Sequence, residues 1–581
     1  MPGKRIPAHL RIQKNKMSAD PKYRIPEPIN LPDRKWPDRI LTAPPVWASV
    51  DLRDGNQALP EPMTPKQKLE YFNMLVGIGF KEIEVSFPSA SEDDFNFVRM
   101  LIEKDLAPDD VRISVLTQAR KHLIDRTIES LKGVKSAIAH CYVATSDLHG
   151  RFVFGDTREQ VLQMAVEGTR MVRDAIAKAN LEKVVSYEFS PEEFTDSDLN
   201  FVIDLCCAVK EEWGEATPNT FILNLPATVE RRPPNQYADM IEYFCRNYPY
   251  LKDTRISLHA HNDQGCAVAA TELALLAGAT RVEGTIFGHG ERTGNVDISV
   301  LALNMESRGI KSNLNFKNLP EIVRIVERNS GIEVHPRHPY AGSLVFTAFS
   351  GSHQDAIRKG LEKREEIGKF FHQGWKIPYL HLDPADVGRQ YERLIRINSQ
   401  SGKGGVVFVL EKEFGIYPPK SMHPEIGRII QHYIDTHGGE MDSKLLRDIF
   451  YENFVNRPGV YRMENYQRAS AGDLSGVNFT WYINGVPHEL TAQGNGPLSA
   501  VVHALKGSGL MPFFKLEDFS ERSLGTDADA RAMAFVGLRT SPDSSLLAYG
   551  AGEHANINRA AIAALVCALN RAVESGVLPR P

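Results

Sequence analysis

The chain has 581 residues, well above the length at which domain sizes peak, so we expect two or three domains. Hydrophobic residues make up 42% and charged residues 24%, and 68 Lys and Arg nearly balance 73 Asp and Glu, which excludes a disordered chain and a strongly basic nucleic-acid binder. Six scattered cysteines without a C-x-x-C pair indicate neither a disulfide framework nor a cysteine zinc site, and the apolar runs are too short to cross a bilayer. We therefore expect a cytoplasmic protein that binds neither nucleic acid nor membrane.

The N-terminal stretch is basic. Its first 19 residues carry five Lys and Arg and no acidic residue, a bias shared by transit peptides and by plain basic arms. Pro2 and Pro7 and the scarcity of apolar residues argue against an amphipathic helix. We therefore interpret residues 1–44 as an N-terminal arm.

Short β-branched runs then alternate with longer amphipathic stretches. The clearest helix start is Thr64, a hydroxyl N-cap, followed by Pro65 at the first helical position. Strand-like runs end near Leu52, Phe87, Thr117, Thr145, Phe189, Leu225, His259 and Phe287. Eight strand–helix units predict a (β/α)8 TIM barrel over 45–316. A doubly wound sheet would normally show a glycine-rich first turn, which D-G-N at 54–56 is not.

The pattern changes after the barrel. Helical segments broken by prolines predict small helical linker subdomains over 317–438, within which the apolar run 406–410 is interpreted as a strand. From 439 to 581, short hairpin-like strands fall into two halves, each followed by a helical stretch. We expect this last part to be an α+β domain.

Polar residues follow the predicted strands at the barrel end that carries active sites. Asp54 follows the first strand, His259 and His261 lie at the seventh, and Asn295 follows the eighth. Two imidazoles at i and i+2 point to the same side of a strand and can share one cation. We predict a divalent-metal site of these four residues, and the ligand types leave Zn²⁺, Mn²⁺ and Mg²⁺ open. His289 lies near Asn295 in the sequence but can equally face solvent.

Other strand ends provide candidates for a substrate pocket. These are Arg53, His140, Ser190 and Thr228. With the metal, they can hold a small 2-oxo acid whose carbonyl the metal polarises. Ser190 and Thr228 taken singly are more often helix caps, but their shared location favours substrate contact.

Three motifs are D-L-R-D-G-N-Q from Asp51, S-L-H-A-H-N-D from Ser257 and G-H-G-E-R-T-G-N from Gly288. Together they resemble the acetyl-CoA-dependent Claisen-condensing barrel enzymes, which include isopropylmalate, homocitrate and citramalate synthases. Further segments resemble the long form of the 2-isopropylmalate synthases: Y-E-F-S-P-E from Tyr187, N-L-P-A-T from Asn224, S-H-Q-D-A-I from Ser352, N-S-Q-S-G-K-G-G from Asn398 and G-N-G-P-L from Gly494. The likeness covers most of the chain.

The resemblance implies a reaction: acetyl-CoA condenses with 3-methyl-2-oxobutanoate (2-oxoisovalerate) and water to give 2-isopropylmalate and CoA, at the first committed step of leucine synthesis. It implies that Arg53 steadies charge on the keto oxygen and that Glu192, His353 and Tyr379 share the acid/base work, with the base among them left open. It also implies a homodimer and leaves open a monovalent cation as activator.

For the C-terminal domain, the resemblance implies feedback inhibition by leucine. Gly494 and Gly496 would let the ligand approach the backbone, and Leu498 would line an apolar pocket. Without the resemblance, the same residues are interpreted as a glycine hairpin with a core leucine. Two alternatives for the whole chain are a citramalate or homocitrate synthase and a non-catalytic amino-acid-binding regulatory protein. The intact Arg53 and Asp54 argue against the second alternative.

Overall fold

The computed structural model describes residues 22–23, 26–348, 351–391, 403–437, 441, 443–471, 474–525, 530–543 and 547–581. Most of the predicted N-terminal arm, and positions 398–402 of the N-S-Q-S-G-K-G-G segment, lie outside the described residues. The chain divides into two compact units, Met1–Val345 with Pro384–Gln390, and Phe346–Asp383 with Tyr391–Pro581.

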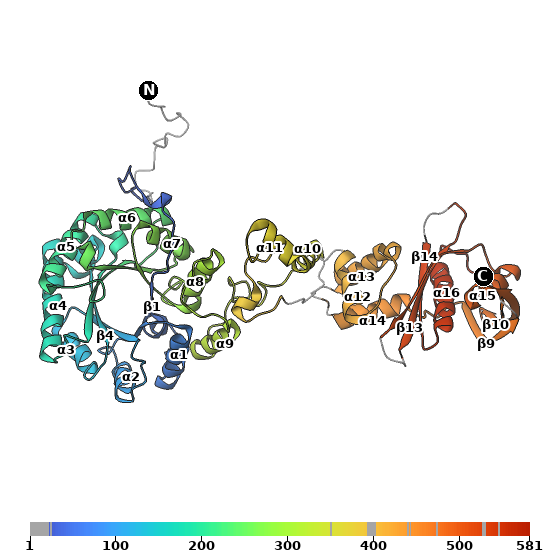
Figure 1. Cartoon of the computed structure of the whole chain (residues 1–581), viewed down its shortest axis with the longest axis horizontal. Helices are drawn as coiled ribbons and strands as arrows, with labels where there is room; N and C mark the ends of the chain where they lie inside the picture. Colours follow the sequence, from blue (N-terminus) through green and yellow to red (C-terminus); the bar gives the residue numbers. More distant parts are fainter. Residues whose placement is uncertain are drawn as a thin grey trace, which may run out of the picture. The chain divides into compact units, whose positions relative to one another are not determined.

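The first unit is built on a closed barrel of eight parallel strands in sequence order, which confirms the predicted TIM barrel (Figure 1). The strands are β1 (Val46–Ser49), β2 (Glu82–Ser86), β3 (Arg112–Gln118), β4 (Ala137–Ala144), β5 (Val185–Glu192), β6 (Phe221–Ala227), β7 (Arg255–Ala260) and β8 (Arg281–Gly284). The barrel closes where β1 pairs with β8, from Val46 opposite Arg281 to Ser49 opposite Gly284.

Helices surround the barrel (Figure 1). They are α1 (Pro65–Ile78), α2 (Glu92–Glu103), α3 (Lys121–Ser130), α4 (Arg158–Lys178), α5 (Leu199–Trp213), α6 (Pro234–Asn247), α7 (Ala267–Ala277), α8 (Ile298–Ser307) and α9 (Leu319–Ser330). The predicted start of α1 is confirmed, because the Thr64 side chain accepts from the backbone N–H of Gln67 in a capping box with Pro65 in the first turn. Gly79 ends the helix at a φ of 114°, which favours glycine.

Short helical turns connect these elements. They are η2 (Trp36–Asp38), η3 (Asp51–Gly55), η4 (Leu148–Phe154), η5 (Phe194–Asp196), η6 (Leu251–Asp253) and η7 (Ile286–Gly288). Four of them follow strands of the barrel: η3 follows β1, η4 follows β4, η5 follows β5 and η7 follows β8. They therefore lie at the end of the barrel where active sites form.

The second unit combines helices with two antiparallel three-stranded sheets, ordered β11-β10-β9 and β12-β13-β14. Its helices before the sheets are α10 (Gly351–Glu362), α11 (Arg364–Phe371), α12 (Lys403–Phe414), α13 (His423–His437) and α14 (Ser443–Phe454), with the turn η9 (Lys420–Met422); the turn η8 (Pro384–Val387) belongs to the first unit. The rest is β9 (Tyr461–Ala471), β10 (Leu474–Ile483), β11 (Val486–Gly494), α15 (Pro497–Gly507), β12 (Lys515–Leu524), β13 (Arg531–Arg539), β14 (Leu547–His554) and α16 (Ile557–Glu574). The predicted α+β domain of two halves, each followed by a helix, is confirmed.

The interpretation of the apolar run 406–410 as a strand was wrong. Residues 406–410 belong to helix α12 and not to a strand. Val406, Val409 and Leu410 are buried at helical spacing, which a short, uniformly apolar run does not reveal in the sequence.

The core of the second unit extends across the predicted boundary between linker and C-terminal domain, at 438/439. Val409, Leu410 and Ile426 of α12 and α13 belong to the same buried cluster as Met533 and Phe535 of β13. Helices α12 and α13 therefore pack with strands that follow the boundary. In the described part of the chain, no helix is long and apolar enough to cross a membrane.

Candidate active site

A pocket of about 230 Å³ lies at the carboxyl ends of the barrel strands. Its lining includes eight residues predicted from the sequence: Arg53, Asp54, His140, Ser190, Glu192, Thr228, His259 and His261. Because these residues come from separate strand ends, the closure of the barrel is what brings them together. His289 is not among the lining residues.

The turn η3 carries Arg53 and Asp54 into this pocket. The carboxylate of Asp51 anchors the turn, since it accepts from the hydroxyl of Tyr71 at 2.8 Å and from the backbone N–H of Ile286 at 3.0 Å. Burial raises the pKa of Asp51 to about 7. The first acid of the D-L-R-D-G-N-Q motif is thus structural, while the second faces the pocket.

Asp54, His259 and His261 form a buried group whose ligand atoms all lie within 4.8 Å of one another. The Oδ2 atom of Asp54 is 3.2 Å from Nε2 of His259 and 3.8 Å from Nε2 of His261. Within the described residues, Nδ1 of His261 is buried and has no hydrogen-bond partner. Two imidazoles and a carboxylate at this spacing fit one divalent cation.

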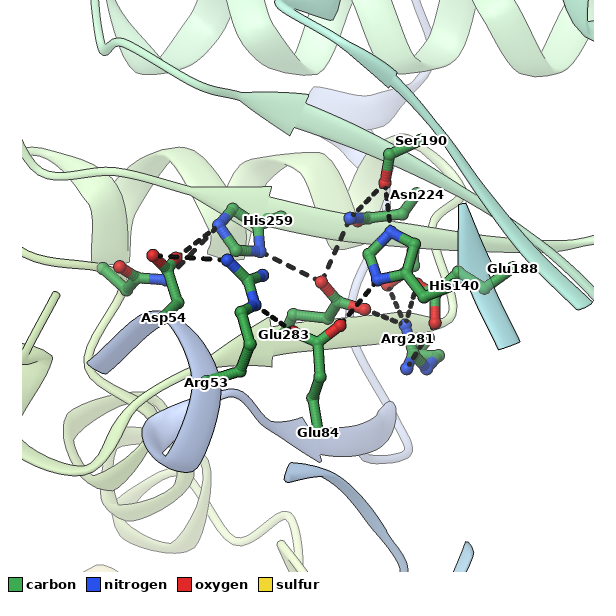
Figure 2. A network of polar contacts seen from close by, with 12 residues as sticks. Arg53, Asp54, Glu84, His140, Glu188, Ser190, Asn224, His259, Arg281 and Glu283 are labelled. Carbon is green, nitrogen blue, oxygen red and sulfur yellow. Dashed lines mark hydrogen bonds and ion pairs between the residues drawn. The ribbon is translucent and has the colours of Figure 1, made fainter. Parts of the chain in front are cut away.

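The second nitrogen of His259 faces a carboxylate that the sequence analysis missed. Nδ1 of His259 lies 3.0 Å from Oε2 of Glu283, which places its proton there and leaves Nε2 directed at Asp54 (Figure 2). Burial lowers the pKa of His259, but Asp54 and Glu283 outweigh it and raise that pKa to about 9. Burial and the nearby charge of His259 lower the pKa of His261 to about 4. A proton therefore competes with a cation for His259.

Asn295 also contacts the group. Its amide nitrogen donates to Oδ2 of Asp54 at 2.8 Å, while its oxygen is buried without a partner among the described residues. In this orientation Asn295 steadies the carboxylate, and coordination through its oxygen needs a half-turn of the amide. The predicted ligand role of Asn295 stays a prediction.

The pocket residues are joined in a closed ring of polar contacts, which Figure 2 shows. Each neighbouring pair lies between 2.6 and 3.4 Å apart. In order, the ring runs through Asp54, His259, Glu283, Asn224, Ser190, His140, Glu84, Arg53 and back to Asp54. Each member is oriented by two others, so the substrate-facing groups are preorganised.

A buried guanidinium next to the ring binds one of its carboxylates, that of Glu283. Arg281, 1% exposed, donates to Glu283 at 2.5 Å, to Glu188 at 2.9 Å and to Glu82 at 2.6 Å. Burial raises the pKa of Glu188 well above its usual range, whereas Arg281 outweighs burial at Glu283 and lowers the pKa of Glu283. His140, Glu188 and Glu283 are close enough for a second metal. Since Arg281 already binds both carboxylates, they form an ion-pair network.

Thr228 and Glu192 both line the pocket, and Thr228 contacts the turn after β5. The hydroxyl oxygen of Thr228 accepts from the backbone N–H of Glu193 at 2.9 Å, which leaves the Thr228 proton free to donate to a substrate. Glu192 lines the pocket, and burial raises its pKa above the usual range. A carboxyl group with a raised pKa is the type that acid/base chemistry uses near neutral pH.

The remaining predicted residues belong to the second unit. The rings of His353 and Tyr379 stack with centroids 3.9 Å apart, and both side chains are exposed. A side chain at Gly494 would overlap the backbone of Ala500, so glycine is needed there for packing against α15, whereas Gly496 faces open space. Leu498 is partly buried against the core to which both sheets, α15 and α16 contribute.

Comparison with known proteins follows the same three parts. Residues 45–326 match the HMGL-like family, 343–411 match "Alpha-isopropylmalate synthase, post-catalytic domain-like", and 440–573 match "LeuA allosteric (dimerisation) domain". The 2-isopropylmalate synthase of Rhodospirillum rubrum is 47% identical over 560 residues, which cover 95% of this chain and 99% of that protein. The chain belongs to the 2-isopropylmalate synthase family.

Relatives within this family are similar over their whole length. The synthase of Schizosaccharomyces pombe is 45% identical over 569 residues, covering 96% of this chain and 97% of that protein. Among solved structures, the HMG-CoA lyase of Bacillus subtilis is 22% identical with a TM-score of 0.41, covering 51% of this chain and 96% of that chain.

Proposed function

We propose that the chain is an acyltransferase that condenses acetyl-CoA with 3-methyl-2-oxobutanoate and water, giving 2-isopropylmalate and CoA in leucine biosynthesis. The observation that carries the proposal is the buried group of Asp54, His259 and His261 at the mouth of the barrel, in a chain of this family. A divalent cation, Mg²⁺, Mn²⁺ or Zn²⁺, held by these three residues would polarise the keto carbonyl of the substrate.

The other pocket residues bind and orient the 2-oxo acid. Glu84 and Asp54 hold the guanidinium of Arg53, which stabilises negative charge that develops on the keto oxygen. Thr228 offers its free hydroxyl proton to the substrate carboxylate. The enzyme must also remove a methyl proton from acetyl-CoA, and Glu192, with its raised pKa, is the candidate base in the pocket. His353 and Tyr379 stay candidates for the remaining acid/base step.

The lining of the pocket favours a short, branched 2-oxo acid. Phe87, Leu116 and Pro226 give it apolar walls. Its two arginines are already paired, Arg53 with Glu84 at 2.6 Å and Arg292 with Asp263 at 2.7 Å. In the described lining, no unpaired cation is therefore left for the second carboxylate of 2-oxoglutarate.

Substrate choice is tested by the release of CoA thiol from acetyl-CoA with 3-methyl-2-oxobutanoate, pyruvate or 2-oxoglutarate. We expect kcat/KM for the branched acid to exceed that for pyruvate by about tenfold or more, because the additional methyl groups fill the apolar walls. With 2-oxoglutarate we expect no turnover above background. A preference for pyruvate or 2-oxoglutarate would identify a citramalate or homocitrate synthase, and no turnover with any acid would favour the non-catalytic alternative.

We further propose a homodimer whose C-terminal domain binds leucine as inhibitor, near Gly496. Removing the domain at residue 438 is a poor test, because it would expose the core that α12 and α13 share with β13. A single substitution leaves this core in place and is therefore the better test. Gly496 has an extended backbone, with φ −163°, and open space at its Cβ position, so the Gly496→Val variant should fold.

We expect Gly496→Val to raise the half-inhibitory leucine concentration by about tenfold or more, because the branched side chain fills the space a ligand needs beside the backbone. Turnover without leucine should not change. The matched control is Gly507→Val at the other end of α15, where the Cβ position is also open. Equal leucine sensitivity in both variants and the wild type would remove Gly496 from the leucine site.

A further inference from the structure

We propose that Glu193, which no motif singled out, is a positioning residue that holds Glu192 in the pocket. The inference rests on the proposed acid/base role of Glu192. The contacts of Glu193 orient the carboxyl group of Glu192. The two adjacent glutamates face different surroundings: Glu192 lines the pocket, whereas Glu193 is 3% exposed and is not among the lining residues.

The backbone of Glu193 is left-handed, with φ 60° and ψ 33°. A residue with a Cβ rarely adopts this conformation, and it persists only where surrounding contacts hold it. The conformation reverses the chain directly after β5, between Glu192 and the turn η5. The direction in which Glu192 leaves the strand therefore depends on what holds Glu193.

The peptide group between the two glutamates is held from both sides. The carbonyl oxygen of Glu192 accepts from the backbone N–H and from the hydroxyl of Thr145, both at 3.0 Å. The N–H of Glu193 donates to Thr228 at 2.9 Å, and the carbonyl of Glu193 accepts from the hydroxyl of Ser197 at 2.8 Å. These partners come from the ends of β4 and β6 and from the residue after η5.

The side chain of Glu193 adds further contacts. Together with those of the peptide group between Glu192 and Glu193, we call these contacts the clamp. Its Oε2 atom accepts from the hydroxyl of Ser146 and contacts Nδ1 of His149. Ser146 and His149 both follow β4, and His149 lies in η4 with its ring 6.0 Å from that of Phe154. A buried carboxylate with two side-chain partners ties the strained turn to the neighbouring loop.

The clamp also shapes the electrostatic surroundings of Glu192. Burial raises the pKa of Glu192, His149 lowers it and Glu193 raises it, while Arg53 and His259 on the far side of the pocket lower it. Tyr142 of β4 also faces the group. His149 and Glu193 act on the pKa of Glu192 in opposite directions, and the role proposed for their contact is geometric.

The test compares Glu193→Gln and Glu193→Gly in the full-length protein. Glutamine keeps the size but removes the negative charge that Glu193 presents to Ser146 and His149, which weakens both contacts. Glycine adopts a φ of 60° freely, so it keeps the backbone while deleting the carboxylate. We expect kcat to fall by about 10- to 100-fold in both variants, because a displaced base loses alignment with the proton it removes. KM for the 2-oxo acid should stay within about threefold, since both variants keep Arg53, Thr228 and the backbone N–H of residue 193 from which Thr228 accepts.

Two further readouts separate positioning from folding and from the reaction itself. Calorimetric binding of Mn²⁺ should be unchanged, and hydrogen exchange of the peptide covering 192–197 should become faster as the clamp loosens. The matched control is Glu167→Gln, the same change at an exposed residue of α4, for which we expect wild-type values.

Three results would overturn the inference: wild-type kcat in both variants, a kcat loss accompanied by equal losses of folded protein and Mn²⁺ binding, or unchanged exchange at 192–197. If the wild type itself releases no CoA with any 2-oxo acid, the proposed function fails. The exchange measurement still decides whether Glu193 holds the turn.

Discussion

Replacing Asp54 by alanine should reduce kcat by at least about 10³-fold, because Asp54 is the carboxylate of the candidate metal group and loss of a Lewis acid removes several kcal/mol of transition-state stabilisation. Binding of Mn²⁺ or Zn²⁺ to the Asp54→Ala variant, measured by calorimetry, should be weaker than binding to the wild type. The fold should persist. His259 keeps its contact with Glu283 and Arg53 keeps Glu84, so neither buried cation loses its last partner.

The control for Asp54→Ala is Asp110→Ala, the same change in an exposed ion pair with Lys81. It should leave turnover and metal binding at wild-type values. Circular dichroism should show the same barrel in all three proteins. If Asp54→Ala binds metal as tightly as the wild type and turns over within about tenfold of it, Asp54 is not a ligand and the metal group is wrong.

The barrel and much of its pocket were predictable because a TIM barrel imposes its own geometry. Strand ends converge at one face whatever their separation in sequence, so placing Asp54 and His259 at strand ends was enough to predict that they meet. The residues at which individual strands end were predicted less accurately. The eighth strand was expected to run to Phe287, but β8 stops at Gly284, and Phe287 has a φ of 62° that no strand continues through.

The supporting layer of the site was missed for a different reason. Glu84 and Glu283 lie inside strand runs, where a search for polar residues after strand ends does not look. A signal was present, since Glu82 and Glu84, and also Arg281 and Glu283, are charged residues at i and i+2 and thus face the same side of a strand. Charge directed into a barrel interior is costly unless paired, so such pairs indicate an internal network.

Hydrogen-bond roles were beyond the sequence altogether. The oxygen of Thr228, a residue predicted to contact substrate, also accepts from the backbone N–H of Glu193, a contact that depends on the left-handed turn after β5. Asn295 was predicted as a ligand, which stays a prediction, and the hydrogen bond that its amide nitrogen donates to Asp54 was not foreseen. Residue type and strand position predict which side chains share a pocket. The hydrogen bonds within the pocket depend on the backbone conformation of single residues, which the sequence does not reveal.

Replacing Arg281 by methionine should have the largest effect on stability, lowering the free energy of unfolding of the barrel by about 3–5 kcal/mol at neutral pH. Arg281 binds three buried carboxylates, of which Glu82 keeps Arg112 as a partner and Glu283, among the described residues, keeps only His259 as an ionic one. Denaturant unfolding monitored by tryptophan fluorescence measures the loss. The control Arg308→Met, in an exposed pair with Glu272, should cost no more than about 1 kcal/mol.

The loss in Arg281→Met should depend on pH in a defined direction. In the wild type, Arg281 holds the pKa of Glu283 far below its usual range, so this carboxylate stays ionised at mildly acidic pH. Without the guanidinium, burial favours the protonated form in the folded state. The variant should therefore lose stability as the pH rises through and above the pKa of an unfolded glutamic acid, and approach the wild type in acid.

A second substitution separates stability from catalysis. Adding Glu283→Gln to Arg281→Met removes the unpaired charge and should restore part of the lost stability, because replacing both partners of a buried pair costs less than removing one. It should not restore turnover, since the amide of glutamine no longer presents a carboxylate to Nδ1 of His259. Recovery of both quantities together would mean that the network serves the fold alone and that His259 is oriented without Glu283.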